Sequence, residues 1–519
     1  MKRLHFLLAA LVVLIAASCS KSTKTNGLLQ QIPAETDLVV IGNIKTVVQS
    51  AGGSLEGSNL KLPAFLSSHL PSYAMEDIEE MTYFLKNSGI NAETAAMLLD
   101  YKHPDSPVVV FAIENKKQFI DTIEDYEFEE QTSTDKVVIY ARHQYYDIYD
   151  YIAVNGSYAY WTNGNPAMAR YLQNIIDDAR IKSFAKTSCG NYIAGGNTLG
   201  AAITIPDHLK RNLRRQGIPS ELLSFYDGTI CMRGSISGDK CTIDFKHFDE
   251  DGREAKNDFK DWMDTASTID ADVLKFLGKD EFAVYATSIK NVQWDKYADM
   301  LLSNLSRSER AQANVVLSYF EKIDGTVAAG FGLTDGLESM AAISYDEEEL
   351  LSNISSTVII QTRDGKAKQL LNDLKGFLDE AHIPFDESAS GLSVDMDLLN
   401  DTPGVLYAEH RGNCIVIANH PIKESSNPVV NEVKMSKYMQ AFAVVLKRDN
   451  KLMRDLRCDN DIKFTTTCTP KTMDVSMTLE VNGSGSDGLV AKVMKMIIDI
   501  AERADSLEEE YFDSIYYRY

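Results

Sequence analysis

One sequence pattern occurs twice in the chain, as Ile32-Pro-Ala-Glu-Thr-Asp-Leu-Val-Val-Ile-Gly-Asn-Ile-Lys-Thr-Val47 and as Leu277-Gly-Lys-Asp-Glu-Phe-Ala-Val-Tyr-Ala-Thr-Ser-Ile-Lys-Asn-Val292. In each copy a run typical of a β-strand is followed directly by a polar–apolar pattern that can start a helix. The two copies therefore indicate that two related segments begin with a strand that passes into a helix.

The elements predicted after each copy recur in the same order. A strand and a helix, a hairpin, a strand entering a helix, two long strands and a closing helix are expected at 107–113, 116–125, 148–162, 201–213, 229–248 and 254–266. Their counterparts are expected at 356–362, 367–380, 405–419, 443–456, 462–481 and 487–504. One departure is expected: 326–334 and 339–345 form an added hairpin in the second copy, whereas 61–99 of the first is helical.

This repeat predicts an α+β fold with two tandem related domains, at 28–267 and 268–506. Each is expected to hold mostly antiparallel sheet with helices packed on one side, because hairpins and helices alternate along the chain. The length of 519 residues agrees with more than one domain, since single cores rarely exceed about 250–300 residues. The remaining segments are a signal at 1–19, a tether at 20–27 and an acidic, aromatic tail at 507–519.

The first nineteen residues indicate export. Lys2 and Arg3 precede an apolar stretch that ends in Ala16-Ala17-Ser18-Cys19. The stretch is about 14 residues long, whereas a membrane span needs roughly 20. Its resemblance to bacterial lipoprotein signals implies that Cys19 becomes the N-terminus and carries acyl chains. We therefore expect a chain anchored to a membrane by lipid.

The chain also resembles a domain-of-unknown-function family of large Bacteroides-type lipoproteins. The resemblance rests on this signal, on Leu28-Leu-Gln-Gln-Ile-Pro-Ala34 followed by Leu38-Val-Val-Ile41, and on the duplicated layout. It implies an outer-membrane location and brings no catalytic residues. The tether lacks the acidic run that surface members carry after the cysteine, which favours a periplasm-facing protein, and a cell-surface location stays open.

The net charge and the cysteines limit the possible binding partners and the possible disulfides. A net charge of −23 argues against nucleic-acid binding, which needs a basic surface. Besides Cys19 there are six cysteines, for which fifteen pairings stay open: Cys189, Cys231, Cys241, Cys414, Cys458 and Cys468. The pairs Cys231/Cys241 and Cys458/Cys468 lie near predicted hairpins, so a cross-strand bridge is one alternative for each, and buried free thiols are the other.

A search for catalytic and metal-binding motifs finds none that fits. The sequence has no His-Glu-x-x-His motif and no Gly-x-Ser-x-Gly motif, and the glycine-rich stretch 190–200 lacks the lysine of a phosphate-binding loop. The acidic stretch 249–252 only partly matches a calcium loop, because His247 stands where an oxygen ligand is needed. We predict no metal, no cofactor and no enzyme activity.

One aromatic cluster is the candidate binding site. Asn155-Gly156 predicts a two-residue turn that pairs Tyr151 with Tyr160. Alternation then places Tyr149, Tyr151, Tyr158 and Tyr160 on one face of the hairpin. This face is predicted to bind a ligand, because tyrosine combines an apolar ring with a polar tip. The alternative is that it packs under a helix at 167–179.

The function expected from these observations is that of a non-enzymatic envelope lipoprotein, which binds a protein, peptide or glycan partner. One alternative is a hydrolase acting on envelope or dietary polymers through a pair of carboxylates about 5–10 Å apart. Another is a structural subunit of an envelope assembly, with Tyr511–Tyr519 as its contact.

Overall fold

The structure is a computed structural model of the whole chain. It describes residues 27–63, 65, 72–134, 136–196, 198–216, 223, 227–255, 266–292, 310, 317–336, 339, 353–400, 403–470, 474–483 and 487–499. The predicted signal with Cys19, most of the tether, the tail at 507–519 and most of the predicted helix at 254–266 lie outside these residues. No helix within the described ranges is long and apolar enough to cross a membrane.

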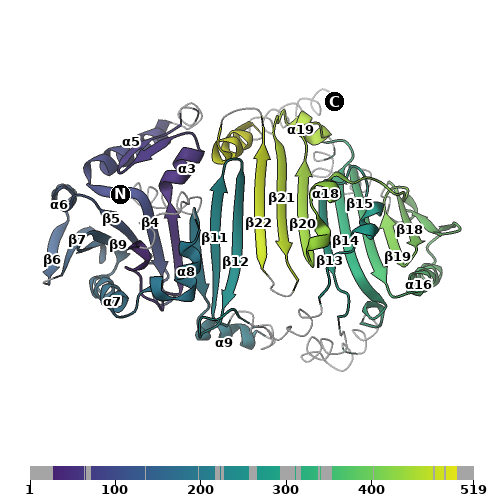
Figure 1. Cartoon of the computed structure of the whole chain (residues 1–519), viewed down its shortest axis with the longest axis horizontal. Helices are drawn as coiled ribbons and strands as arrows, with labels where there is room; N and C mark the ends of the chain where they lie inside the picture. Colours follow the sequence, from purple (N-terminus) through teal and green to yellow (C-terminus); the bar gives the residue numbers. More distant parts are fainter. Residues whose placement is uncertain are drawn as a thin grey trace. The chain divides into compact units, whose positions relative to one another are not determined.

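Contacts divide the chain into two compact units. Unit 1 comprises Met1–Lys256 with Gly485–Ile498, and unit 2 comprises Asn257–Ser484 with Asp499–Tyr519. Each unit has its own strands and helices (Figure 1).

Unit 1 contains ten long strands in the neighbour order β6-β7-β8-β9-β5-β4-β1-β10-β11-β12, and every pair is antiparallel. Their bounds are β1 (Leu38–Asn43), β4 (Ile90–Leu99), β5 (Val108–Ile113), β6 (Glu129–Ser133), β7 (Val137–Tyr145), β8 (Ile148–Asn155), β9 (Tyr158–Gly164), β10 (Leu199–Thr204), β11 (Thr229–Ser237) and β12 (Lys240–Phe248). The short pair β2 (Ser54–Glu56) and β3 (Asn59–Lys61) stands apart. Its helices include α3 (Ile44–Ser50), α5 (Ser72–Asn87), α6 (Lys116–Asp125), α7 (Met168–Ile181), η1 (Phe184–Lys186), α8 (Ser188–Ala194) and α9 (Asp207–Arg215). Residues 489–499 are helical as well, within the helix predicted at 487–504.

Unit 2 has ten strands in the order β16-β17-β18-β19-β15-β14-β13-β20-β21-β22, again all antiparallel. They are β13 (Ala283–Ser288), β14 (Ile323–Leu333), β15 (Ile354–Thr362), β16 (Asp386–Glu387), β17 (Gly391–Asp395), β18 (Val405–Arg411), β19 (Cys414–Ala418), β20 (Gln440–Leu446), β21 (Asp461–Cys468) and β22 (Val475–Asn482). The helices are η3 (Ala271–Phe276), α16 (Lys366–Glu380), α17 (Asp397–Asn400), α18 (Pro428–Glu432), η5 (Met435–Lys437) and α19 (Lys451–Asp455).

The strand order of unit 2 reproduces that of unit 1, strand for strand. The likeness extends to an irregularity: the β4–β5 register shifts between Asn91 and Ala95, and the β14–β15 register shifts between Ile323 and Val327. The prediction of an added hairpin in the second copy was wrong on this point. β14 has its counterpart in β4, whereas the second strand expected at 339–345 lies almost wholly outside the described residues. Within 61–99, α5 is helical as predicted and β4 is not, because pairing with neighbouring strands overrides local helix preference.

The predicted fold class was wrong in two respects. First, the long strands form one antiparallel sheet of twenty strands, not two separate sheets. Second, helices do not pack on one side only, as the cores of the units show.

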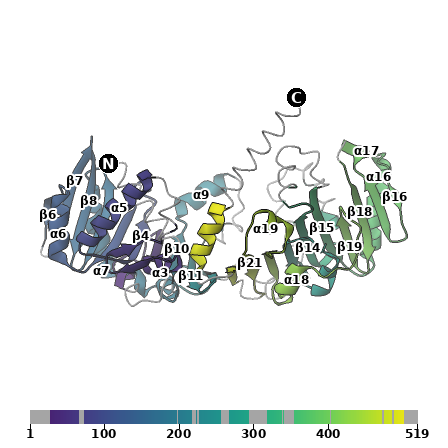
Figure 2. The same ribbon diagram turned by 90° about the horizontal axis from the view of Figure 1, so that it is seen from above.

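Both faces of the sheet in unit 1 are apolar and covered. In β5, Val108 and Val110 belong to a core cluster under α7 and α8, whereas Val109 and Ile113 belong to a second cluster with α6. Successive residues of a strand point to opposite faces, so two covering layers are needed. In unit 2, likewise, one cluster forms around η3 and α18, and another forms where α16 packs on β18 and β19 (Figure 2).

Candidate functional site

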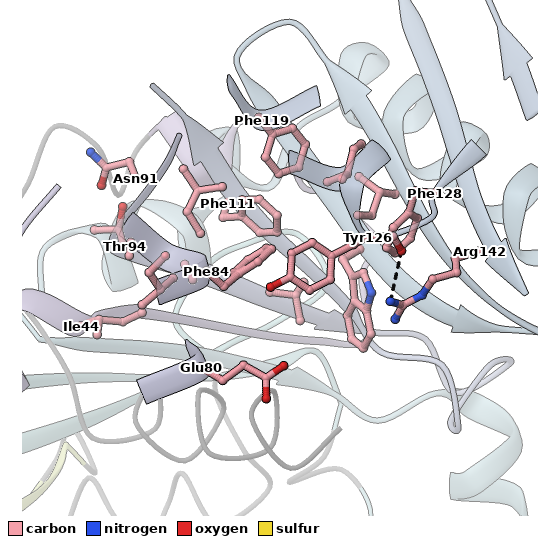
Figure 3. A pocket seen from close by; sticks show the side chains of 18 residues that line it. Ile44, Glu80, Phe84, Asn91, Thr94, Phe111, Phe119, Tyr126, Phe128 and Arg142 are labelled. Atoms are coloured by element: carbon pink, nitrogen blue, oxygen red, sulfur yellow. Dashed lines mark hydrogen bonds between the residues drawn. The ribbon is translucent and has the colours of Figure 1, made fainter. Parts of the chain in front are cut away.

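A cavity of about 140 Å³ lies in unit 1, between the sheet and the helices α3, α5 and α6. Six aromatic side chains from five parts of the chain form much of its wall (Figure 3). They are Phe84, Phe111, Phe119, Tyr126, Phe128 and Trp161. Almost all of the lining surface is apolar, so the cavity suits an apolar occupant.

Helix α6 supplies one wall because of its amphipathic pattern. Phe119 and Ile123 are four residues apart, so they lie on one face of the helix, and both are almost fully buried. The helix begins at a capped end, where the Asn115 side chain accepts a hydrogen bond from the backbone N–H of Gln118. The cap fixes where the helix starts and thereby which side chains reach the cavity.

The aromatic rings contact one another edge to face. The ring centroids of Phe84 and Tyr126 are 5.4 Å apart, and those of Phe111 and Phe119 are 5.9 Å apart. Such pairs add roughly 0.5–1.5 kcal/mol beyond burial. Burial also raises the pKa of Tyr126, so its hydroxyl stays neutral at physiological pH. The aromatic part of the wall is therefore uncharged.

Arg142 lies at one end of the cavity. Its guanidinium lies over the ring of Phe128, 4.9 Å from the centroid, and donates to the Tyr126 carbonyl oxygen at 3.3 Å (Figure 3). It also pairs with the fully buried Asp150 at 2.7 Å, and Gln144 donates to the same carboxylate oxygen. The carboxylate of Asp150 therefore balances the positive charge of Arg142.

Thr94 and Asn91 lie towards the other end (Figure 3). The register shift in β4 brings both to the cavity, and both are almost fully buried. The Asn91 amide donates to Glu114, whereas the Thr94 hydroxyl has no hydrogen-bond partner among the described residues. At the same position after the shift in unit 2, Thr326 accepts a hydrogen bond from the Asp270 N–H at 2.7 Å.

The predicted tyrosine face packs into the core. Tyr151 and Tyr160 are 4% and 0% exposed, and Tyr149 and Tyr158 are partly buried against the same cluster under α7. The Tyr160 hydroxyl donates to the backbone oxygen of Gln31 at 3.2 Å. Packing against the core is enough to explain why these four positions are tyrosines, with no ligand needed. It also leaves no open surface at Tyr151 and Tyr160. The binding role of this face stays a prediction.

The turn of that hairpin differs from the expected one. Tyr158 pairs with Asn155 and Tyr160 with Ala153, so the turn lies at Gly156-Ser157, where Gly156 has φ of +63°. The predicted pairing of Tyr151 with Tyr160 was wrong by two residues. A slip of two keeps every side chain on its predicted face, because side chains alternate with period two.

One disulfide joins Cys189 of α8 to Cys231 of β11. The cross-strand bridges considered for Cys231/Cys241 and Cys458/Cys468 are therefore wrong: Cys241, Cys458, Cys468 and Cys414 are free. Burial raises the pKa of Cys414 to about 11 and that of Cys468 to about 11, so these thiols stay protonated and unreactive at neutral pH.

One pair of carboxyl groups is relevant to the hydrolase alternative. Asp37 lies beside Asp100, near a cavity of about 510 Å³ that is also lined by His103 and Tyr171. Burial and the neighbouring Asp100 raise the pKa of Asp37. The hydrolase alternative stays a prediction.

No metal site emerges from the described residues, among which no three histidine, cysteine or acidic side chains converge. The acidic stretch at 249–252 forms a turn in which Asp249 accepts a hydrogen bond from the Arg253 N–H.

Sequence reasoning missed the cavity in unit 1. Its aromatic residues are spread over nearly eighty positions, and only the sheet and α6 bring them together. A weak signal was present: Tyr126 and Phe128 follow directly after the amphipathic helix that carries Phe119.

No protein-family model matches the chain, and no curated protein matches it. A solved structure, "Structure of crystal form IV of TP0453", aligns with 42% of this chain and 79% of its own, at 8% sequence identity and a TM-score of 0.24. A likeness of this size carries no argument about function.

Proposed function

We propose that the chain is a non-enzymatic, envelope-anchored lipoprotein that binds an apolar molecule, or an apolar group of a larger partner, in the cavity of unit 1. The aromatic lining of that cavity carries the proposal. The anchor at Cys19 and the resemblance to Bacteroides-type lipoproteins belong to the proposal and rest on the sequence alone.

The size of the cavity supports a small occupant. An apolar cavity of about 150 Å³ stays dry and takes up benzene. The cavity in unit 1, at about 140 Å³, is comparable. Burying the roughly 150 Å² of one aromatic ring contributes about 4 kcal/mol, which corresponds to a dissociation constant near 1 mM.

The lining also separates the partner classes expected from the sequence. A glycan would bring hydroxyl groups into a wall that offers them few hydrogen bonds, and each unpaired group would cost about 1–3 kcal/mol. An apolar side chain of a peptide or protein, or a small apolar molecule, meets no such cost. The proposal therefore favours these over a glycan.

Binding of ethylbenzene to the soluble chain that begins after Cys19 tests the proposal. Trp161 lines the cavity, and substituting the other two tryptophans, W262F and W294F, leaves it as the fluorescent reporter. We expect saturable binding with a dissociation constant near 1 mM. Ala95→Leu adds three carbons inside the cavity and should weaken binding at least about tenfold, since the space is then filled.

The matched control is Ala167→Leu, which adds the same carbons at an exposed position and should leave binding unchanged. If Ala95→Leu lowers the melting temperature, Val109→Ile adds one carbon to the same wall and replaces it. The proposal fails if ethylbenzene does not bind, or if filling the cavity leaves its affinity unchanged.

A further inference from the structure

We propose that the occupant of the unit 1 cavity carries an uncharged hydrogen-bond acceptor, such as a hydroxyl or carbonyl oxygen, which meets Arg142. This inference rests on the proposed function and names the chemical class of the molecule bound there.

Arg142 has donors to spare. A guanidinium offers five N–H groups. Among the described residues, one nitrogen donates to the Tyr126 carbonyl and another to Asp150. The side chain lines the cavity and keeps 18% of its surface exposed. An acceptor at this end of the cavity can therefore take a hydrogen bond from Arg142 without displacing either protein contact.

The charges around Arg142 select against an ionic head group. Asp150 is fully buried beside the guanidinium and cancels its charge, and Glu80 is exposed and also lines the cavity. Arg142 and Asp150 together present no net charge, so an ionic head group would lose its hydration in this apolar cavity without a full opposite charge to replace it. A neutral oxygen avoids this cost.

The far end of the cavity offers a weaker alternative for the acceptor. The Thr94 hydroxyl is 1% exposed and has no hydrogen-bond partner among the described residues. A hydroxyl is a neutral donor, and hydrogen bonds from charged donors are roughly twice as strong. Arg142 is also the more exposed of the two. The acceptor is therefore expected at Arg142, and Thr94 provides the comparison.

Four probes with one carbon skeleton test the inference: ethylbenzene, 2-phenylethanol, phenylacetate and 2-phenylethylamine. We expect 2-phenylethanol to bind at least about tenfold more tightly than ethylbenzene, which is the effect of one added hydrogen bond to a charged donor. Phenylacetate and 2-phenylethylamine should bind more weakly than 2-phenylethanol. Tighter binding of either charged probe would overturn the inference.

Substitutions locate the hydrogen bond. Arg142→Lys keeps the positive charge beside Asp150 but has fewer donors and a different geometry, so it should remove most of the preference for 2-phenylethanol. Thr94→Val should leave that preference intact. If Thr94→Val removes it and Arg142→Lys does not, the acceptor lies at the wrong end and the inference is refuted. Melting temperatures of both variants establish that they fold.

The two proposals fail in different ways. If ethylbenzene does not bind, the proposed function fails and the head group is irrelevant. If ethylbenzene binds and 2-phenylethanol binds no more tightly, the cavity is a purely apolar site and only the inference about Arg142 is wrong.

Discussion

Reduction of the Cys189–Cys231 disulfide is expected to lower the stability of unit 1 by about 4 kcal/mol. The bridge closes a loop with a sequence separation of 42. The entropy that such a loop removes from the unfolded chain corresponds to about 4 kcal/mol at 25 °C. The bridge also ties α8 to β11, and both cysteines belong to the core cluster under α7 and α8. With a urea dependence of about 2–3 kcal/mol/M, the unfolding midpoint should fall by about 1.3–2 M.

The assay is urea unfolding at equilibrium, with and without a thiol reductant, followed by the fluorescence of Trp161 in the variant that lacks the other two tryptophans. C189A/C231A should unfold at the same urea concentration under both conditions. Cys241→Ala, which removes a free thiol from the neighbouring strand, should respond to reductant as the parent does. An unchanged midpoint for the reduced parent protein would refute the entropic reasoning.

Three further predictions concern single residues. Gly228→Ala should lower the free energy of unfolding in urea by at least about 2 kcal/mol, because Gly228 has φ of +87° and a Cβ there would lie 2.1 Å from the Phe248 carbonyl oxygen. The control Gly238→Ala, where φ is +57° and the space around the Cβ is open, should lower it by only about 1 kcal/mol. The hydrogen bond that protonated His420 donates to the Glu281 carboxylate raises the pKa of His420. The stability that this contact adds is therefore present below pH 6.5 and lost as pH rises through the folded pKa; His420→Gln should abolish that loss between pH 5 and 9. Burial raises the pKa of Asp37, so the folded state holds the proton of this carboxyl group more tightly than the unfolded state does. The free energy of unfolding should therefore fall as pH rises from about 3.8 through the folded pKa, and Asp37→Asn should lack this fall when stability is measured across the same pH range.

Most of the local structure could be predicted from sequence because it depends on near neighbours. The strand–helix start at Ile32–Val47 was predicted correctly, since β1 passes into α3. In the second copy β13 confirms the predicted strand, and the helix expected after it falls on residues outside the described ones. The Tyr149–Tyr160 face was also assigned to one side of its hairpin, although the turn was misplaced, because alternation survives a slip of two residues.

The rest depended on contacts between distant residues. Ala92, Ala95 and Ala96 favour a helix in isolation, yet they lie in β4 because β1 and β5 pair with that strand on both edges. The partner of Cys231 is forty-two residues away on α8, and no local spacing signals it. Apolar residues on both faces of the strands, as in Val108 and Val109, were the available hint that helices cover the sheet on both sides.

The same strand order surrounds different side chains in the two units, and the difference separates scaffold from site. In unit 1, Trp161 of β9 pairs with Val109 and with Ile152, all three of which line the cavity. At the corresponding place in unit 2, Ile417 of β19 pairs with Val358 and Ala408. These residues are paired with both neighbouring strands in each unit, so the backbone arrangement does not require an aromatic residue there. The indole of Trp161 and the rings around it are therefore better explained by what the cavity of unit 1 holds than by the demands of the sheet.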